Sequence, residues 1–238
     1  MFRQPRTWII GAILVVVAGI AATLIVTSGD ERAAPPPTTS SSTSTSSSTT
    51  TTSTPVDNSG AAVFPAATGT TRYTDPIAAA NGFATTYVGF VDPFVGTFRQ
   101  GDARSGEVDV QPFADGPVTT VFVRQLGPDD SWWVIGAATA NIAASEPAAL
   151  ASITSPVTLA GTSTAFEGTV QVQVRVDGRA EPLATGFVTG GANGEIGPFQ
   201  STLAFPPPGA GAGSVVFFTV SAENGSILEA AVVRVRFT

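Results

Sequence analysis

Apolar and polar residues alternate strictly along residues 169–176, TVQVQVRV, where valine fills every second position. Residues 231–237 repeat this pattern near the end of the chain, with an apolar residue at each odd position and arginine at positions 234 and 236. Successive side chains of a β-strand point to opposite faces of a sheet. Each segment therefore predicts a strand with one face in a hydrophobic core, and we interpret the four valines as core residues rather than as the wall of a binding site.

The region that contains both segments, residues 147–238, has the strand and turn spacing of an all-β fold. Asp-Gly, Asn-Gly and Pro-Pro-Pro-Gly sequences separate several apolar runs, and Asn224-Gly225 is typical of a two-residue hairpin turn. Strands are expected at residues 157–161, 169–176, 181–189, 197–205, 215–222 and 227–238. The region is therefore predicted to be an antiparallel β-sandwich.

The preceding region, residues 62–146, combines one helical pattern with several strand patterns. Asp75 or Thr74 can cap a helix that has Pro76 at its first position, and apolar residues follow at helical spacing. Strands are expected at residues 106–113, 118–126 and 131–139. We predict a small α+β unit with one helix on an antiparallel sheet, and a chain that is mainly β.

The first part of the chain indicates a membrane anchor and a stalk. Residues 8–27 contain no charged side chain and are long enough to cross a bilayer as a transmembrane helix. Arginine precedes this segment, so the positive-inside bias places residues 1–7 in the cytoplasm as a short stub. Residues 28–61 are rich in Ser, Thr and Pro and are expected to form a disordered stalk. The rest of a single-pass protein of the cell membrane is then extracytoplasmic; a cleaved signal peptide is the alternative.

Composition excludes most kinds of active site. The chain has no Cys and no His, and its 11 basic residues are all arginine. It therefore lacks the commonest metal ligands, a thiol nucleophile and the usual general base. Only carboxylates could act as acid or base, and Glu107 and Asp109 share one face of a predicted strand. A charged outer face explains this pair as well, so we predict no catalytic, cofactor-binding or metal-binding residue and no cofactor.

Two adjacent tryptophans and three arginines are the first candidate binding residues. Trp132 and Trp133 point to opposite faces of their strand, so one ring is expected in the core under the helix, and the other could stack on a sugar or a partner protein. Arg175, Arg234 and Arg236 lie on the polar faces of the two alternating strands. If these strands share a sheet, the arginines form a polar strip, which is expected to be solvated.

Four segments, in order along the chain, resemble the bacterial spore-germination immunoglobulin-like domain family. They are SPVTLAG at residues 155–161, AFEGTVQVQV at 165–174, GPFQSTLAF at 197–205 and SAENGS at 221–226. The resemblance covers about residues 150–238 and implies an immunoglobulin-like sandwich in a membrane-anchored envelope protein of actinobacterial type, without established catalysis. Within this pattern, Phe166 is expected to close one end of the core. Glu167 is expected to accept backbone hydrogen bonds from the preceding loop, with ligand binding as the alternative.

The resemblance and the charge of the chain together narrow the function. The chain after residue 33 carries 8 Arg against 16 Asp and Glu, so nucleic acid is not expected as a partner. The leading hypothesis is a non-catalytic protein that presents a binding or scaffolding module to a cell-envelope protein or to cell-wall glycan. The alternatives are a dedicated carbohydrate- or peptidoglycan-binding module and, third, a hydrolase that relies on carboxylates.

Overall fold

The computed structural model describes residues 59–127 and 129–238, all of which fall in the same unit of the chain. The predicted cytoplasmic stub, the transmembrane segment at residues 8–27 and nearly all of the stalk lie outside these ranges and stay predictions. Among the described residues, no helix is both long enough and apolar enough to cross a membrane.

The described chain is mainly β with one short α-helix, as the sequence predicted. Its first part consists of η1 (Ser59–Ala61), α1 (Pro76–Gly82), the π-helical turn η2 (Phe83–Val88), β1 (Phe94–Asp102), β2 (Ser105–Gln111), β3 (Thr119–Gln125), β4 (Trp132–Thr139) and β5 (Ile142–Glu146). β2, β3 and β4 confirm the three strands expected here. β1 and β5 were not predicted, because both are largely exposed and lack a clear apolar alternation.

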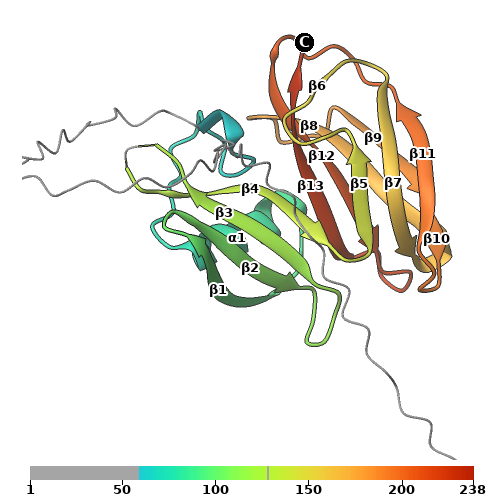
Figure 1. Ribbon diagram of the computed structural model, residues 1–238, viewed down its shortest axis with the longest axis horizontal. Helices are drawn as coiled ribbons and strands as arrows, with labels where there is room; N and C mark the ends of the chain where they lie inside the picture. The colour runs from blue at the N-terminus through green and yellow to red at the C-terminus, as the bar shows by residue number, and fades with distance from the viewer. Residues whose placement is uncertain (1–58, 128) are drawn as a thin grey trace, which may run out of the picture. The chain divides into compact units, whose positions relative to one another are not determined.

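Capping residues explain where α1 begins. The Asp75 carboxylate accepts a hydrogen bond from the backbone N–H of Ala78 at 2.7 Å, and Pro76 occupies the first helical position. The helix continues as η2, which ends at Gly89 in the left-handed conformation with φ of 104°. Phe83 and Ala84 are buried, so this helical segment lays an apolar face on the sheet of β1 to β4 (Figure 1).

The second part is the predicted antiparallel sandwich. Its elements are β6 (Ser152–Ile153), β7 (Val157–Ala165), the 3₁₀ turn η3 (Phe166–Gly168), β8 (Thr169–Val176), β9 (Ala184–Thr189), β10 (Gly191–Ala192), β11 (Gly197–Leu203), β12 (Gly211–Val220) and β13 (Ile227–Phe237). β8 has the predicted bounds, whereas β7 ends at Ala165 instead of 161 and β12 begins at Gly211 instead of 215.

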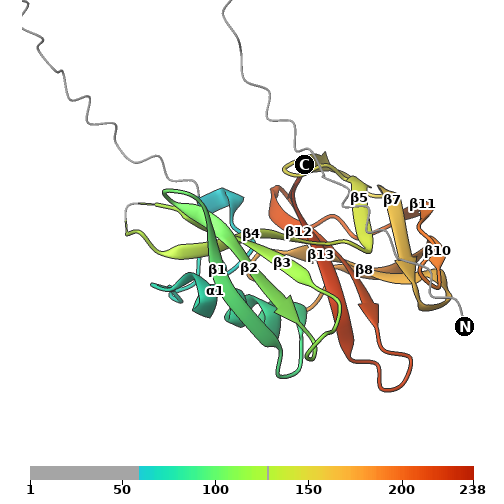
Figure 2. The same cartoon turned by 60° about the horizontal axis from the view of Figure 1, so that its bottom comes forward.

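One continuous hydrogen-bonded path links both parts of the chain. Its strand order is β1-β2-β3-β4-β13-β12-β8-β9, and β4 joins β13 through the pairing of Ala137 with Val232. β7 lies off this path and pairs with β5, β10 and β11. The strands β5, β7 and β11 therefore form a second layer, which faces β8, β12 and β13 (Figures 1 and 2).

The alternating valines of β8 are core residues, as predicted. Val170, Val172 and Val174 are at most 1% exposed and pack between the two layers of the sandwich. Leu159 of β7 and Phe199 of β11 reach the same core from the opposite layer. The alternation thus reflects a strand with one buried face.

Strand β13 contributes to two hydrophobic cores. Ala231 and Val235 pack into the core between the sandwich layers, while Ala230 and Val232 pack into the core beneath α1. Both faces of β13 are therefore covered over much of its length. The sequence indicated only the first of these faces, because the arginines at 234 and 236 suggested a solvated second face.

Candidate functional site

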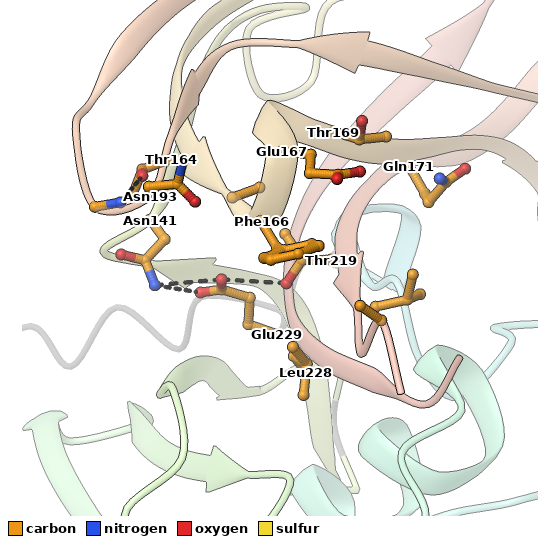
Figure 3. A pocket seen from close by; sticks show the side chains of 14 residues that line it. Asn141, Thr164, Phe166, Glu167, Thr169, Gln171, Asn193, Thr219, Leu228 and Glu229 are labelled. Atoms are coloured by element: carbon orange, nitrogen blue, oxygen red, sulfur yellow. Dashed lines mark hydrogen bonds between the residues drawn. The ribbon is translucent and has the colours of Figure 1, made fainter. Parts of the chain in front are cut away.

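A pocket lies at the end of the sandwich where β7 meets β8 and where β12 meets β13 (Figure 3). It has a volume of about 570 Å³. Its polar lining residues include Asn141, Thr164, Glu167, Gln171, Asn193 and Glu229, and Phe166 is its aromatic lining residue. These residues come from segments far apart in the sequence, so only the folded chain assembles the pocket.

A left-handed turn presents Phe166 and Glu167 at this pocket. The turn η3 connects β7 to β8, and Glu167 has φ of 55° and ψ of 18°, a conformation that residues with a long side chain rarely adopt. Gly168 follows with φ of 72°, and a Cβ at this position would lie 2.9 Å from the carbonyl oxygen of Gly190. The tight turn leaves the Phe166 side chain 62% exposed.

Both expectations for this turn are corrected by the structure. Phe166 does not close the core, because the turn places its ring at the surface; Ile142, 2% exposed, is buried at this end of the core instead. Glu167 is also exposed, and its carboxylate makes no hydrogen bond within the described ranges. The left-handed turn therefore places an aromatic ring and a carboxylate at adjacent positions in the sequence, and both side chains are exposed.

A buried carboxylate lies in the wall of the pocket. Glu229, near the start of β13, is 4% exposed. Its oxygen atoms accept hydrogen bonds from Asn141 Nδ2 at 3.1 and 3.2 Å and from Thr219 Oγ1 at 3.2 Å (Figure 3). A further hydrogen bond comes from Thr139 Oγ1. All of these donors are neutral, and no arginine of the described chain forms an ion pair with Glu229. A buried carboxylate must be hydrogen-bonded, and three neutral side chains meet that need here.

The sequence interpretation missed Glu229. It lies two positions before Ala231 and so extends the inward-facing row of β13, where every other expected side chain was apolar. A charged residue in an otherwise apolar row could have indicated that Glu229 belongs to a polar site. Asn141 and Asn193 carried no signal, because asparagine is common in turns for conformational reasons alone.

The predicted tryptophans lie away from the pocket. Trp133 is 3% exposed, and the Arg72 guanidinium lies 4.7 Å from the centroid of its ring. Trp132 is half-buried against the core beneath α1, and its ring meets that of Phe98 edge-on with 5.2 Å between centroids. Both rings are packed, the first by the chain before α1 and the second by β1.

Arg175 and Arg234 lie in one row across the sheet, as the predicted strip required. The strand register places Arg175 of β8 and Arg234 of β13 on either side of Ser214 of β12. The expectation that this row is solvated is wrong for both residues, because the first part of the chain covers them. Arg236 lies one pleat further along β13 and is exposed.

The side chains of this row form hydrogen bonds with residues in the first part of the chain. Arg175 donates to the backbone carbonyl of Tyr87, and its guanidinium lies 4.8 Å from the centroid of the Tyr87 ring. The hydroxyl groups of Tyr87 and Ser214 form a hydrogen bond, and burial raises the pKa of the Tyr87 hydroxyl. Arg234 donates to the carbonyl oxygen of Gly60 at 3.0 and 3.1 Å. The arginines thus hold the first part of the chain on the sandwich.

The carboxylate pair of β2 forms a charge network with β1. Arg99 donates to Glu107 Oε2 at 3.2 Å and to Asp109 Oδ1 at 2.8 Å, and Thr120 Oγ1 donates to Asp109 at 2.8 Å. The hydrogen bond from Arg99 lowers the pKa of the Asp109 carboxyl. Within the described ranges, no group of three or more acidic residues is arranged as a metal site. The pair is thus the charged outer face that the sequence allowed.

The two facing layers define an immunoglobulin-like sandwich with a pocket at one end, and its longer sheet continues into an α+β layer. Residues 141–226 match the family model of the immunoglobulin-like domain of bacterial spore germination. This match confirms the predicted resemblance, and the family is not a known enzyme family. Phe166 and Glu167 lie inside the matched range, whereas Glu229 lies just beyond it. No curated protein and no solved structure gives a significant match to the chain.

Proposed function

We propose that the protein is a non-catalytic, membrane-tethered extracytoplasmic protein that presents its immunoglobulin-like module to a partner in the cell envelope. The observation that carries the proposal is the pocket formed by Phe166, Glu167 and Glu229. Its volume of about 570 Å³ falls in the range of pockets that bind small ligands or side chains. An exposed phenylalanine beside such a pocket is an apolar anchor for a partner, since aromatic residues are enriched at interfaces.

The packing of the first part of the chain supports a presenting role. Arg234 holds Gly60 against β13, and Arg175 holds Tyr87 against β8, so the beginning of the described chain is fixed on the sandwich. A stalk before residue 59 would therefore pull on a preformed unit rather than on a loose segment. A tract rich in Ser, Thr and Pro would also keep the pocket at a distance from the membrane.

The carboxylates favour binding over catalysis. A hydrolase that relies on carboxylates needs two acids that are free to converge on one bond. Asp109 is held by Arg99 and Thr120, and both oxygen atoms of Glu229 already accept hydrogen bonds. Of the two pocket carboxylates, Glu229 accepts hydrogen bonds and Glu167 makes none within the described ranges, and a single exposed carboxylate is suited to contact with a ligand.

Cell-wall glycan is a second candidate ligand of the same pocket. The observation that favours it is the exposed ring of Phe166 in a pocket lined by the amides of Asn141, Gln171 and Asn193. An amide side chain offers both donors and an acceptor to sugar hydroxyl groups, while an aromatic ring offers an apolar platform.

Proximity labelling in intact cells tests the proposal. A full-length chain with a labelling enzyme fused after Thr238 should label a reproducible set of envelope proteins, and Phe166→Ala should remove a member of that set. Phe94→Ala is the matched control, because Phe94 is 55% exposed on β1 and does not line the pocket. The same labelled set with Phe166→Ala as with the unmodified chain would refute the pocket as the binding site. Labelling of cytoplasmic proteins would refute the localisation.

A further inference from the structure

We infer that the pocket binds a cationic side chain, arginine or lysine, of a partner polypeptide. This inference rests on the proposed function, because it names the group that the partner brings to the pocket. Three features of the pocket support it: the negative charge, the burial of one carboxylate and the exposure of the other, and the exposed ring of Phe166.

The pocket has a single sign of charge. Glu167 and Glu229 are its charged lining residues, and no arginine among residues 59–127 and 129–238 lines it. The chain has no lysine, and of the arginines on β8 and β13, Arg175 contacts Tyr87 and Gln173, Arg234 contacts Asp177 and Gly60, and Arg236 is not among the residues that line the pocket. The negative charge of the pocket is therefore not neutralised by any residue of the described ranges, and it favours a cationic ligand over an anionic or neutral one.

The two carboxylates contribute in different ways. Glu229 is 4% exposed and surrounded by neutral donors, so its charge acts through a poorly screened interior rather than by direct contact. Glu167 is exposed, and its carboxylate makes no hydrogen bond within the described ranges, so both of its oxygen atoms can accept from an ammonium or guanidinium group. Glu229 attracts the cation and Glu167 binds it.

Phe166 completes a site for a cation. Its ring is 62% exposed, and in the view of Figure 3 it lies between Glu167 and Glu229. The face of an aromatic ring attracts a guanidinium or ammonium group, and an adjacent carboxylate adds hydrogen bonds to the same group. The left-handed backbone of Glu167, with φ of 55°, sets the directions in which the two side chains leave the main chain.

Two blocked peptides of equal length test the charge requirement on the full-length chain in detergent. One carries a single arginine between glycines, and the other carries citrulline, which has nearly the same shape without the charge. NMR titration should shift the backbone amides of residues 166–168 and 193–194 with the arginine peptide, at an affinity about tenfold above that of the citrulline peptide. The difference should shrink as the salt concentration rises.

Charge variants locate the effect. Glu167→Gln should lower the affinity for the arginine peptide to that for the citrulline peptide and should leave the latter unchanged. Glu181→Gln removes the same charge from an exposed loop beyond the other end of β8, so it should change neither affinity. Equal affinities of the two peptides for the unmodified chain would overturn the inference. A shift of the same amides by a neutral chito-oligosaccharide, without a response to the arginine peptide, would overturn it in favour of a glycan.

The labelling experiment separates this inference from the proposed function. If Phe166→Ala and Glu167→Gln both remove the envelope partner, the function and the charge requirement are both supported. If only Phe166→Ala removes it, the pocket binds a partner by another chemistry and the inference fails alone. If neither variant removes it, the proposed function fails.

Discussion

The guanidinium of Arg234 forms a two-point hydrogen bond with the carboxylate of Asp177, at 2.5 and 2.6 Å, although Arg234 is only 3% exposed. Asp177 follows β8, whereas Arg234 lies on β13, and the same guanidinium also holds the carbonyl oxygen of Gly60. One buried cation therefore connects the beginning of the described chain, the β8–β9 turn and the last strand. Its only ion-pair partner among the described residues is Asp177.

Asp177→Ala should destabilise the protein markedly. The substitution leaves the buried Arg234 charge without a counter-ion, and loss of one member of a buried pair costs about 3 to 5 kcal/mol. Asp177 is 31% exposed, so water can partly replace it and we expect a loss of about 2 to 3 kcal/mol in the free energy of unfolding. Urea denaturation of the full-length chain measures this loss.

Arg236→Gln is the control for this measurement. Arg236 lies on the same face of β13 but is exposed, so its substitution should change the free energy of unfolding by less than about 0.5 kcal/mol. Equal effects of the two substitutions would show that the Arg234–Asp177 pair does not stabilise the fold.

Tyr87→Phe tests whether the two parts of the chain unfold together. The substitution removes the hydrogen bond to Ser214, which is fully buried, and leaves its hydroxyl without a partner. We expect a loss of about 1 to 2 kcal/mol, and the double variant Tyr87→Phe, Ser214→Ala should recover much of it because both polar groups are then gone. A single unfolding transition by circular dichroism and by tryptophan fluorescence should accompany each variant. Additive losses, or two separate transitions, would contradict this expectation.

The sequence predicted most of the strands but not how the two parts of the chain are joined. The strands β8 and β13 could be predicted from their alternation because an apolar side chain indicates a buried position, and Val172 and Val235 are indeed buried. Arg234 was misread because a buried arginine has the same one-dimensional pattern as a solvated one, and its partners Gly60 and Asp177 are far away in the sequence. The burial of Arg234 depends on contacts with residues that are distant in the sequence. The alternation of neighbouring residues carries no information about such contacts.

The candidate site was only partly predictable for the same reason. Glu167 was singled out from its place before a long strand, yet its left-handed conformation is set by the tight turn into Gly168. Glu229 and Asn141 are 88 residues apart in the sequence, and only the packing of the two layers brings them within hydrogen-bonding distance. Phe166 and Glu167 were therefore singled out from the sequence, whereas Glu229 and Asn141 were not.

Asp109→Asn should make the protein less sensitive to acid. Arg99 holds the pKa of the folded Asp109 carboxyl below its unfolded value of about 3.9, so the stabilisation is complete above that value and is lost as the pH falls through the folded pKa. The variant should be less stable than the unmodified chain at pH 7, by less than about 1 kcal/mol because the pair is partly exposed, and the two should converge at low pH. Free energies of unfolding measured from pH 7 to pH 2 test this.

Arg99 provides the thermodynamic control for that prediction. Adding Arg99→Gln to Asp109→Asn should change the pH profile little, because the pair with Asp109 is already broken and the remaining pair of Arg99 with Glu107 is exposed to solvent. A persistent difference between Asp109→Asn and the unmodified chain at the lowest pH would show that the effect does not come from ionisation of this carboxyl.

Glu167→Asn should stabilise the protein while it weakens binding. A residue with a Cβ in the left-handed conformation costs on the order of 1 kcal/mol, and asparagine tolerates that conformation better than glutamate, so the free energy of unfolding should rise by about 0.5 kcal/mol. The carboxylate that binds the cation is lost, so the arginine peptide should bind no better than the citrulline peptide. Glu167→Gln separates the two effects, because it removes the charge but keeps the backbone cost: it should weaken binding equally without raising stability. A gain in stability with both variants would mean that charge repulsion in the pocket, rather than backbone conformation, is the cost that Glu167 imposes on the fold.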